Sequence, residues 1–152
     1  MKSFRHVLIG ICFLATVACS PNRDEAAILS AKAGYAISDG NIFEGRRLLS
    51  QAIEMRPDVV EYRVALAGLL VDLEELEEAN GHYQHALELV SAESDQDPER
   101  VDDHIFILIK LDKRDEAMAV LQDAIERFPN SETIRLLLEN QDTLFEAAGD
   151  GD

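Results

Sequence analysis

Small and large apolar residues recur along the chain at spacings of four and then three positions. The sets are Gly45, Leu49 and Ala52; Ala79, Tyr83 and Ala86; and Ala117, Leu121 and Ala124. Residues four and three apart lie on one face of an α-helix, so each set predicts a helix with an apolar stripe. No segment reads as a strand. The pattern therefore predicts an all-α chain.

The stripes repeat along the sequence. The interval from Gly45 to Ala79 is about 34 residues, a period typical of helical repeat proteins. The interval from Ala79 to Ala117 is the same period lengthened by an insertion within residues 91–96. Residues 40–57 and 112–129 both end in Ala-Ile-Glu-x-x-Pro, and a proline there stops a helix. The pattern resembles the tetratricopeptide repeat (TPR) from about Ala26 to Leu144, which implies a short right-handed solenoid of antiparallel helix pairs.

The resemblance also implies boundaries for the repeats. They run over residues 26–59, over 60–93 and onward from Pro98, and a capping helix follows from about 130 to 147, giving seven helices in all. Asp58 is expected as an N-cap with Glu61 as its capping-box partner, and Asp97 as the N-cap before Pro98. The turn at residues 72–76 lacks the glycine that Gly40 supplies earlier. An ordinary helical bundle is the alternative fold.

Residues 1–18 differ from the rest of the chain. Lys2 and Arg5 precede an uncharged apolar run at residues 7–18, which is too short to span a bilayer comfortably. This layout predicts a secretory signal peptide; an uncleaved membrane anchor is the alternative. Residues 14–19 resemble the lipobox of bacterial lipoproteins, which implies a lipid on Cys19, whereas ordinary cleavage would leave Cys19 unmodified. Ser20, in place of Asp, favours the outer membrane.

These signals give the expected domain organisation. It consists of a signal peptide at 1–18, a linker at 19–25, a TPR domain at 26–147 and a mobile tail at 148–152. The resemblance to the lipobox implies a lipoprotein of the bacterial cell envelope that faces the periplasm. The second cysteine, Cys12, lies inside the leader, so no disulfide is expected in the mature chain.

The charge narrows the range of partners. Over 152 residues the net charge is −16, and without residues 1–18 the chain has 12 basic and 30 acidic residues, or −18. Nucleic-acid binding needs clustered Lys and Arg residues, so we do not expect this acidic chain to bind DNA or RNA. The acidic body has no affinity of its own for anionic lipid. A membrane contact is therefore expected only through a lipid on Cys19.

The sequence contains few candidates for chemistry. We find no phosphate-binding loop, nucleophile elbow or zinc-type cysteine spacing, so we predict neither an enzyme nor a cofactor. Glu78, His82 and His85 lie on one helical face and could hold a metal ion, but an exposed position without metal is the favoured interpretation. His104 falls at a core-facing position of its repeat.

The resemblance implies a concave groove lined by the first helix of each pair. Its predicted partner-binding residues are Glu61, Val64, Gly68, Val71, Asp72, Asp102, Phe106, Ile109 and Asn140. The Lys and Asn residues of the family's carboxylate clamp are absent from the equivalent sites. The lining forms an apolar strip with an acidic rim, which favours a basic or amphipathic protein segment.

Two alternatives to an open groove remain. The last helix could fold over the groove and fill it, or the solenoid could pack against other copies as a structural component. The sequence predicts no oligomeric state.

Overall fold

The computed structural model describes residues 21–146, which form eight α-helices and no strand. The helices are α1 (Pro21–Ser38), α2 (Ile42–Met55), α3 (Val60–Asp72), α4 (Leu76–Ser94), α5 (Arg100–Lys110), α6 (Arg114–Arg127), α7 (Glu132–Glu139) and α8 (Gln141–Glu146). The all-α prediction is confirmed. The predicted signal peptide, Cys19 and the tail at 148–152 lie outside the described residues, and α1 begins inside the segment expected as a linker.

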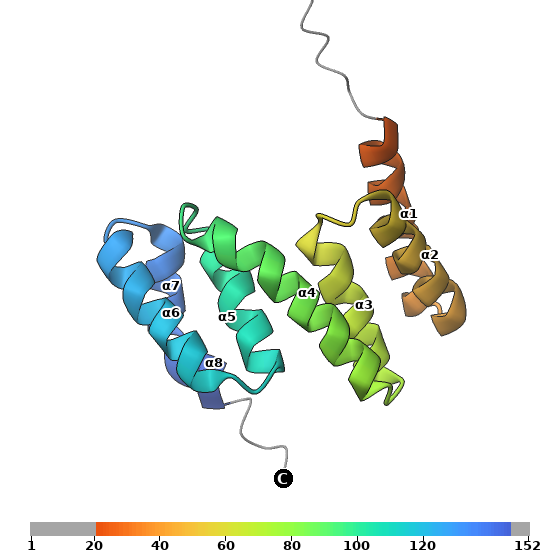
Figure 1. The fold of residues 1–152 in the computed structure, drawn as a ribbon. Helices are drawn as coiled ribbons and strands as arrows, with labels where there is room; N and C mark the ends of the chain where they lie inside the picture. Colours follow the sequence, from red (N-terminus) through yellow and green to blue (C-terminus); the bar gives the residue numbers. More distant parts are fainter. Residues whose placement is uncertain (1–20, 147–152) are drawn as a thin grey trace, which may run out of the picture.

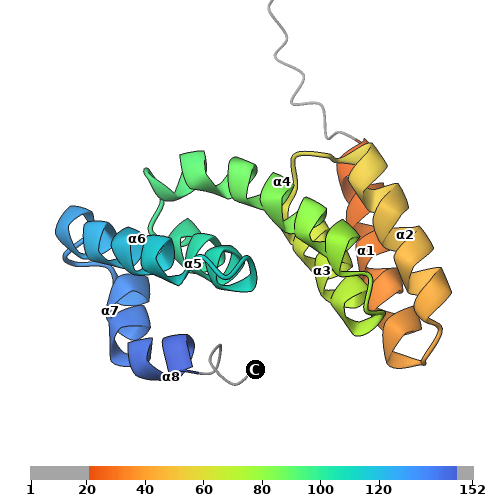
Figure 2. The same cartoon turned by 60° about the horizontal axis from the view of Figure 1, so that its bottom comes forward.

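The first six helices form three antiparallel pairs, α1–α2, α3–α4 and α5–α6, as the repeat pattern predicts (Figure 1). Successive pairs meet where α2 packs on α3 and α4 packs on α5. Figure 2 shows the pairs arranged as an arch, with α4 on the outer side and α3 and α5 beneath it. Helices α7 and α8 form one limb of the arch, and the α1–α2 pair forms the other. The fold is therefore a short solenoid of helix pairs.

Small residues allow the two helices of a pair to approach closely. Ala33, Ala67, Ala79 and Ala117 are 0–1% exposed at the signature positions. Gly45 is also buried, and a methyl group there would overlap Cγ1 of Ile37. The spacing between α1 and α2 therefore depends on the absence of a side chain at Gly45.

Larger apolar residues join one pair to the next. Leu69 of α3 lies in a cluster with Leu48 and Leu49 of α2. At the equivalent position of the next pair, Ile107 of α5 lies in a cluster with Tyr83 of α4. Leu69 is 4% exposed and Ile107 is fully buried. Burial of these side chains stabilises the stacking of the pairs.

The turn inside each pair uses one residue in the left-handed conformation. These residues are Gly40 (φ 78°), Glu74 (φ 62°) and Asp112 (φ 57°), which stand at equivalent positions of the three repeats. After each of them the next amide donates to a carbonyl five residues back, as when the Glu75 amide donates to Leu70 at 2.9 Å. This is the Schellman arrangement that ends a helix. The turn at 72–76 therefore keeps the shared geometry without glycine.

We predict that Glu74→Gly raises the free energy of unfolding by about 1 kcal/mol, because glycine adopts the left-handed conformation without a Cβ clash. Urea denaturation measures the effect. Glu74→Ala is the matched control, since it removes the same charge and keeps the unfavourable backbone. A gain of equal size in Glu74→Ala would assign the effect to charge and contradict the backbone explanation.

Two predicted helix caps are wrong. The N-cap of α3 is Val59, without a side-chain cap, because the carboxylate of Asp58 instead pairs with Arg56 at 2.8 Å. Helix α5 begins at Arg100 with Glu99 as N-cap. Asp97 Oδ1 accepts a hydrogen bond from the Glu99 amide at 3.0 Å, so it closes a turn before the helix.

The prediction of seven helices is also wrong, because the capping helix is divided at Asn140. The Nδ2 group of Asn140 donates to the Leu136 carbonyl at 2.7 Å, and its backbone amide donates to the same oxygen at 3.1 Å. A side chain that bonds to the preceding turn in this way competes with the regular helix ladder. Helix α7 ends there, and α8 begins at the next residue.

Candidate functional site

The predicted groove residues lie on α3, α5 and the end of α7. Val71 and Phe106 are 43% and 38% exposed, as expected of a binding surface. Glu61, Asp72, Asp102 and Asn140 are also exposed, and Gly68 is half-buried. Val64 and Ile109 were expected to be exposed, and that expectation is wrong. They are half-buried because Val64 packs on the buried cluster of α3, α4 and α5, and Ile109 packs on the buried cluster of α5, α6 and α7.

One hollow brings two of the predicted residues, Asp102 and Asn140, together. It has a volume of about 310 Å³ and lies between α5 and the α7–α8 limb. Its lining consists of Asp102, Thr133, Leu136, Leu137, Asn140 and Leu144. We call this the inner hollow. It has an apolar wall, two neutral polar groups and a single carboxylate, so it suits a side chain with an apolar stem and a charged end.

Asp102 is exposed as a residue, but its carboxylate is partly shielded from water. Burial, followed by the nearby charge of Asp103, raises the pKa of Asp102 above its ordinary value. The carboxylate of Asp103 is engaged by Arg100 at 2.9 Å. No side chain among those described forms an ion pair or hydrogen bond with Asp102. A cation placed in the inner hollow would be attracted to this charge.

Phe106 lies one helical turn after Asp102 on α5. The Nζ atom of Lys110 lies 5.2 Å from the centre of its ring. This is the geometry of a cation–π interaction, in which the ring face attracts a positive charge. The α5 surface therefore already accommodates a cation beside its exposed aromatic ring.

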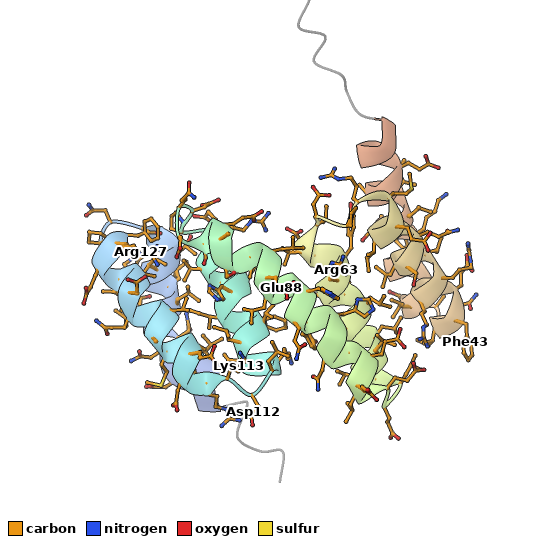
Figure 3. The ribbon with its side chains drawn as sticks, viewed as in Figure 1. Phe43, Arg63, Glu88, Asp112, Lys113 and Arg127 are labelled. Atoms are coloured by element: carbon orange, nitrogen blue, oxygen red, sulfur yellow. The ribbon has the colours of Figure 1, made fainter. Side chains whose placement is uncertain are left out.

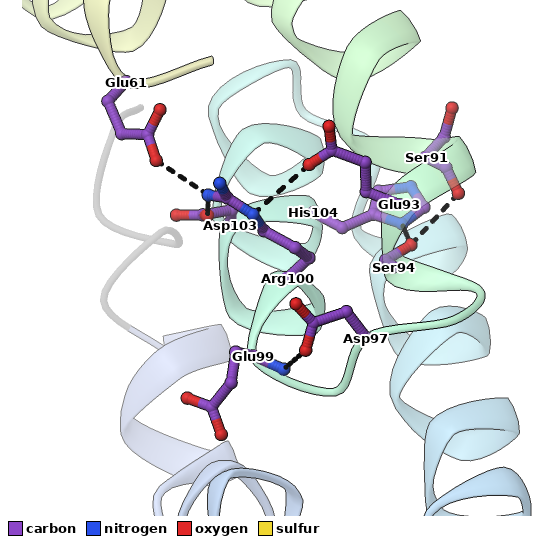
Figure 4. A network of polar contacts seen from close by, with 9 residues as sticks. All are labelled: Glu61, Ser91, Glu93, Ser94, Asp97, Glu99, Arg100, Asp103 and His104. Atoms are coloured by element: carbon purple, nitrogen blue, oxygen red, sulfur yellow. Dashed lines mark hydrogen bonds and ion pairs between the residues drawn. The ribbon is translucent and has the colours of Figure 1, made fainter. Parts of the chain in front are cut away.

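Arg100 connects three helices on the inner side of the arch (Figure 4). It binds Glu61 of α3 at 2.7 Å, Glu93 of α4 at 3.2 Å and Asp103 of α5 at 2.9 Å. Burial acts to raise the pKa of Glu61, but the hydrogen bond and charge of Arg100 outweigh it, so the pKa is lowered. Glu61 therefore stabilises the junction between the second and third pairs, whereas the sequence predicted it as a partner-binding residue and as the capping-box partner of Asp58.

Sequence reasoning missed Arg100, although the sequence contained a signal. By the repeat spacing, Arg100 is equivalent to Ile28 and Tyr62, which are apolar and aromatic respectively. An arginine at a position that other repeats fill with a large apolar or aromatic residue indicates a local change in packing. Only the folded structure brings Glu61 and Glu93 close enough to Arg100 to form ion pairs with it.

We expect Arg100→Ala to lower the free energy of unfolding by about 1 kcal/mol at pH 7, since the ion pairs form a network but remain partly exposed. The loss should shrink on acidification. The pKa of Glu61 is lowered from 4.5, so its contribution is complete above pH 4.5 and is lost as the pH falls through the folded-state value. Urea denaturation at several pH values measures both effects.

Arg135→Ala provides the control for Arg100→Ala. Among the described residues, Arg135 forms ion pairs with Glu132 and Glu139 alone, both in its own helix, and its side chain is 55% exposed. We expect a clearly smaller loss for Arg135→Ala, because solvent screens these exposed pairs. Equal losses in the two variants would remove the junction from the explanation.

The face carrying Glu78, His82 and His85 is partly occupied by a contact between pairs. Glu78 binds Arg46 of α2 at 2.7 Å, and burial followed by the charge of Arg63 lowers the pKa of His82. Within residues 21–146 no group of three or more His, Cys, Asp or Glu residues is placed to hold a metal ion.

The other histidine singled out by its repeat position makes an internal contact. Nδ1 of His104 lies 2.7 Å from Oγ of Ser94, so it joins the end of α4 to α5. Burial lowers the pKa of His104. His104 is half-buried, in agreement with its predicted core-facing position.

Comparison with known proteins gives structural similarity only. No family model and no curated protein matches the sequence. Among solved structures, the chain is similar to the first TPR domain of Spaghetti (RPAP3), bound to the HSP90 peptide SRMEEVD. The identity is 16%, the coverage is 84% of this chain and 95% of that chain, and the TM-score is 0.49.

It is also similar to the N-terminal domain of stress-induced protein-1 (STI-1) from C. elegans. Here the identity is 14%, the coverage is 80% of this chain and 98% of that chain, and the TM-score is 0.48.

Proposed function

We propose that this protein is a non-enzymatic interaction module that holds a segment of a partner protein on the inner side of the arch. The observation that carries the proposal is the inner hollow, where the unpaired carboxylate of Asp102 faces an apolar wall. A charge that costs stability in the free protein and would be neutralised by a ligand marks a candidate binding site. Phe106 extends this surface along α5.

The partner segment is basic and amphipathic. Its apolar side chains contact Leu136 and Phe106, and a Lys or Arg side chain enters the inner hollow toward Asp102. The surrounding charge supports this choice, because residues 57–146 contain 23 acidic and 7 basic residues. Such complementarity speeds association and makes the affinity fall with added salt. Helices α7 and α8 leave the inner hollow as space for a ligand.

We predict that Asp102→Asn weakens binding of a basic segment and, at neutral pH, raises the melting temperature of the free protein. A raised pKa means that ionising Asp102 costs stability, so this cost is present above the folded-state pKa and disappears as the pH falls below the ordinary value of 3.8. Melting curves at pH 7 and pH 3 test the stability effect. A drop in melting temperature at pH 7 would contradict the assigned electrostatics.

Binding is tested by titrating a synthetic amphipathic helix of Leu and Lys residues into the purified protein. Asp102→Asn and Phe106→Glu should each weaken binding, Asp102→Asn by about tenfold. Asp123→Asn is the matched control, because Asp123 lies on α6 and its carboxylate is used by Arg127. Capture from a cell-envelope extract with wild type and Phe106→Glu extends the test to natural partners. Equal recovery by both would remove the inner side of the arch from the proposal.

We further propose that the protein is a lipoprotein of the bacterial cell envelope, anchored through Cys19 after removal of residues 1–18 and facing the periplasm from the outer membrane. The lipobox-like residues before Cys19 and the neighbouring Ser20 support this proposal. No helix within residues 21–146 is long and apolar enough to cross a bilayer. Palmitate labelling with a Cys19→Ala control tests the anchor, and label retained in Cys19→Ala would refute it.

A further inference from the structure

The charge of the chain is divided unevenly between the α1–α2 pair and the rest. Residues 21–56 contain five basic and five acidic residues and are neutral, whereas residues 57–146 carry a net charge of −16. Two copies that meet through their acidic parts repel each other. A contact involving the α1–α2 pair avoids that repulsion.

The outer stripe of α1 resembles an interface without a partner. Tyr35 is equivalent by the repeat spacing to Leu69 and Ile107, which are buried against the preceding pair, yet Tyr35 is 75% exposed. Ile28 on the same stripe is 52% exposed. Lys32 lies between them, and no described side chain forms an ion pair with it. We call Ile28, Lys32 and Tyr35 the head face.

A third apolar side chain extends the exposed surface of this pair. Phe43, at the start of α2, is 81% exposed. Figure 3 shows it at the outer edge of the α1–α2 pair, pointing away from the other helices. At the equivalent positions of the later pairs stand Glu77 and Asp115, so the first pair has an aromatic ring where the others have acids.

The opposite end of the arch has a hollow whose chemistry complements that of the head face. It has a volume of about 350 Å³ and lies between α6 and the α7–α8 limb, separate from the inner hollow. It is lined by Met118, Leu121, Gln122, Ile125, Leu138, Gln141, Asp142 and Phe145. Met118 and Leu138 are 57% and 41% exposed, and no ion pair to Asp142 is formed within the described part of the chain. We call this the tail hollow.

We propose that the head face of one copy docks into the tail hollow of a second copy. Tyr35 then fills apolar space beside Met118 and Leu138, and Lys32 approaches Asp142. Residues 114–146, which form the tail end, contain eight acidic and three basic residues, so a neutral face with a central lysine is complementary to it. A contact between two different surfaces leaves a head and a tail free, and the assembly therefore grows beyond a dimer.

Sedimentation velocity of the purified protein over a range of concentrations tests this inference. The wild type should form species larger than a dimer. Tyr35→Glu in the head face and Met118→Glu in the tail hollow should each weaken association by more than about tenfold. Ala27→Glu and Ala119→Glu are the controls, because they add the same charge at exposed positions of α1 and α6 outside the two proposed surfaces.

Mixing the two interface variants gives the decisive result. Tyr35→Glu retains its tail and Met118→Glu retains its head, so the mixture should form a heterodimer that cannot grow. A monomeric wild type, or a mixture that stays monomeric, would overturn the inference. A monomer that instead binds phosphatidylcholine vesicles through Tyr35 would overturn it too and assign the head face to a membrane. Failure here leaves the binding results for Asp102→Asn and Phe106→Glu unchanged, since those residues lie outside both surfaces.

Discussion

Ile107→Ala is expected to lower the free energy of unfolding by about 3 kcal/mol, the largest single effect we predict in this chain. The side chain is fully buried among residues of α3 and α4, although it belongs to α5. Truncation leaves a cavity at the junction between the second and third pairs. Because a solenoid is held together by contacts between neighbours, the loss should appear first as separation of α5–α8 from the rest.

Urea denaturation measures the total loss, and hydrogen exchange locates it. Amides in α5 and α6 should lose more protection than those in α1 and α2. Phe106→Ala is the matched control, since the neighbouring ring is 38% exposed and should cost less than about 1 kcal/mol. Phe106→Ala should weaken partner binding, whereas Ile107→Ala should act mainly on stability. Uniform loss of protection over all helices would show that the pairs unfold as one unit.

Gly45→Ala is expected to lower the free energy of unfolding by about 2 kcal/mol, although alanine ordinarily favours a helix over glycine by about 1 kcal/mol. The added methyl group would overlap Cγ1 of Ile37 and approach the carbonyl oxygen of Ala33 to 3.4 Å. A β-branched side chain has few rotamers with which to move away. The α1–α2 pair must therefore separate slightly, and contacts between these helices weaken.

A double-mutant cycle with Ile37→Ala identifies the cause. In the Ile37→Ala background the overlap is gone, so Gly45→Ala should be neutral or stabilising by up to about 1 kcal/mol. Gly81→Ala is a second control, because a Cβ at Gly81 in α4 would meet no described atom within 4 Å apart from its chain neighbours and the adjacent backbone of its own helix. A destabilisation by Gly45→Ala that persists without Ile37 would place the strain elsewhere.

The two proposed interactions, partner binding and self-association, depend on different residues. The binding proposed for the inner hollow depends on Asp102, whose pKa is raised by partial burial and by the charge of Asp103. The head face and tail hollow depend on exposed Tyr35 and Met118 at the two ends of the arch. The variants proposed for one surface leave the other intact, so partner binding and self-association can be measured independently.

The sequence by itself determined the helix pairs and the small residues buried between them. The four-and-three spacing placed Ala79 and Ala117 in the core, and the repeat period placed Phe106 and Asp102 together on one face of α5. These features depend on helix geometry, which is local, so they can be read from neighbouring positions in the chain.

Only the tertiary structure decided how these residues are used. Glu61 was expected to contact a partner protein. In the structure it forms an ion pair with Arg100, which lies 39 residues away in the sequence. Ile109 packs on the buried cluster of α5, α6 and α7, and Asn140 divided the capping helix and borders the inner hollow. Long side chains reach across helix junctions whose geometry depends on every small residue in the core, and no periodicity in the sequence specifies those contacts.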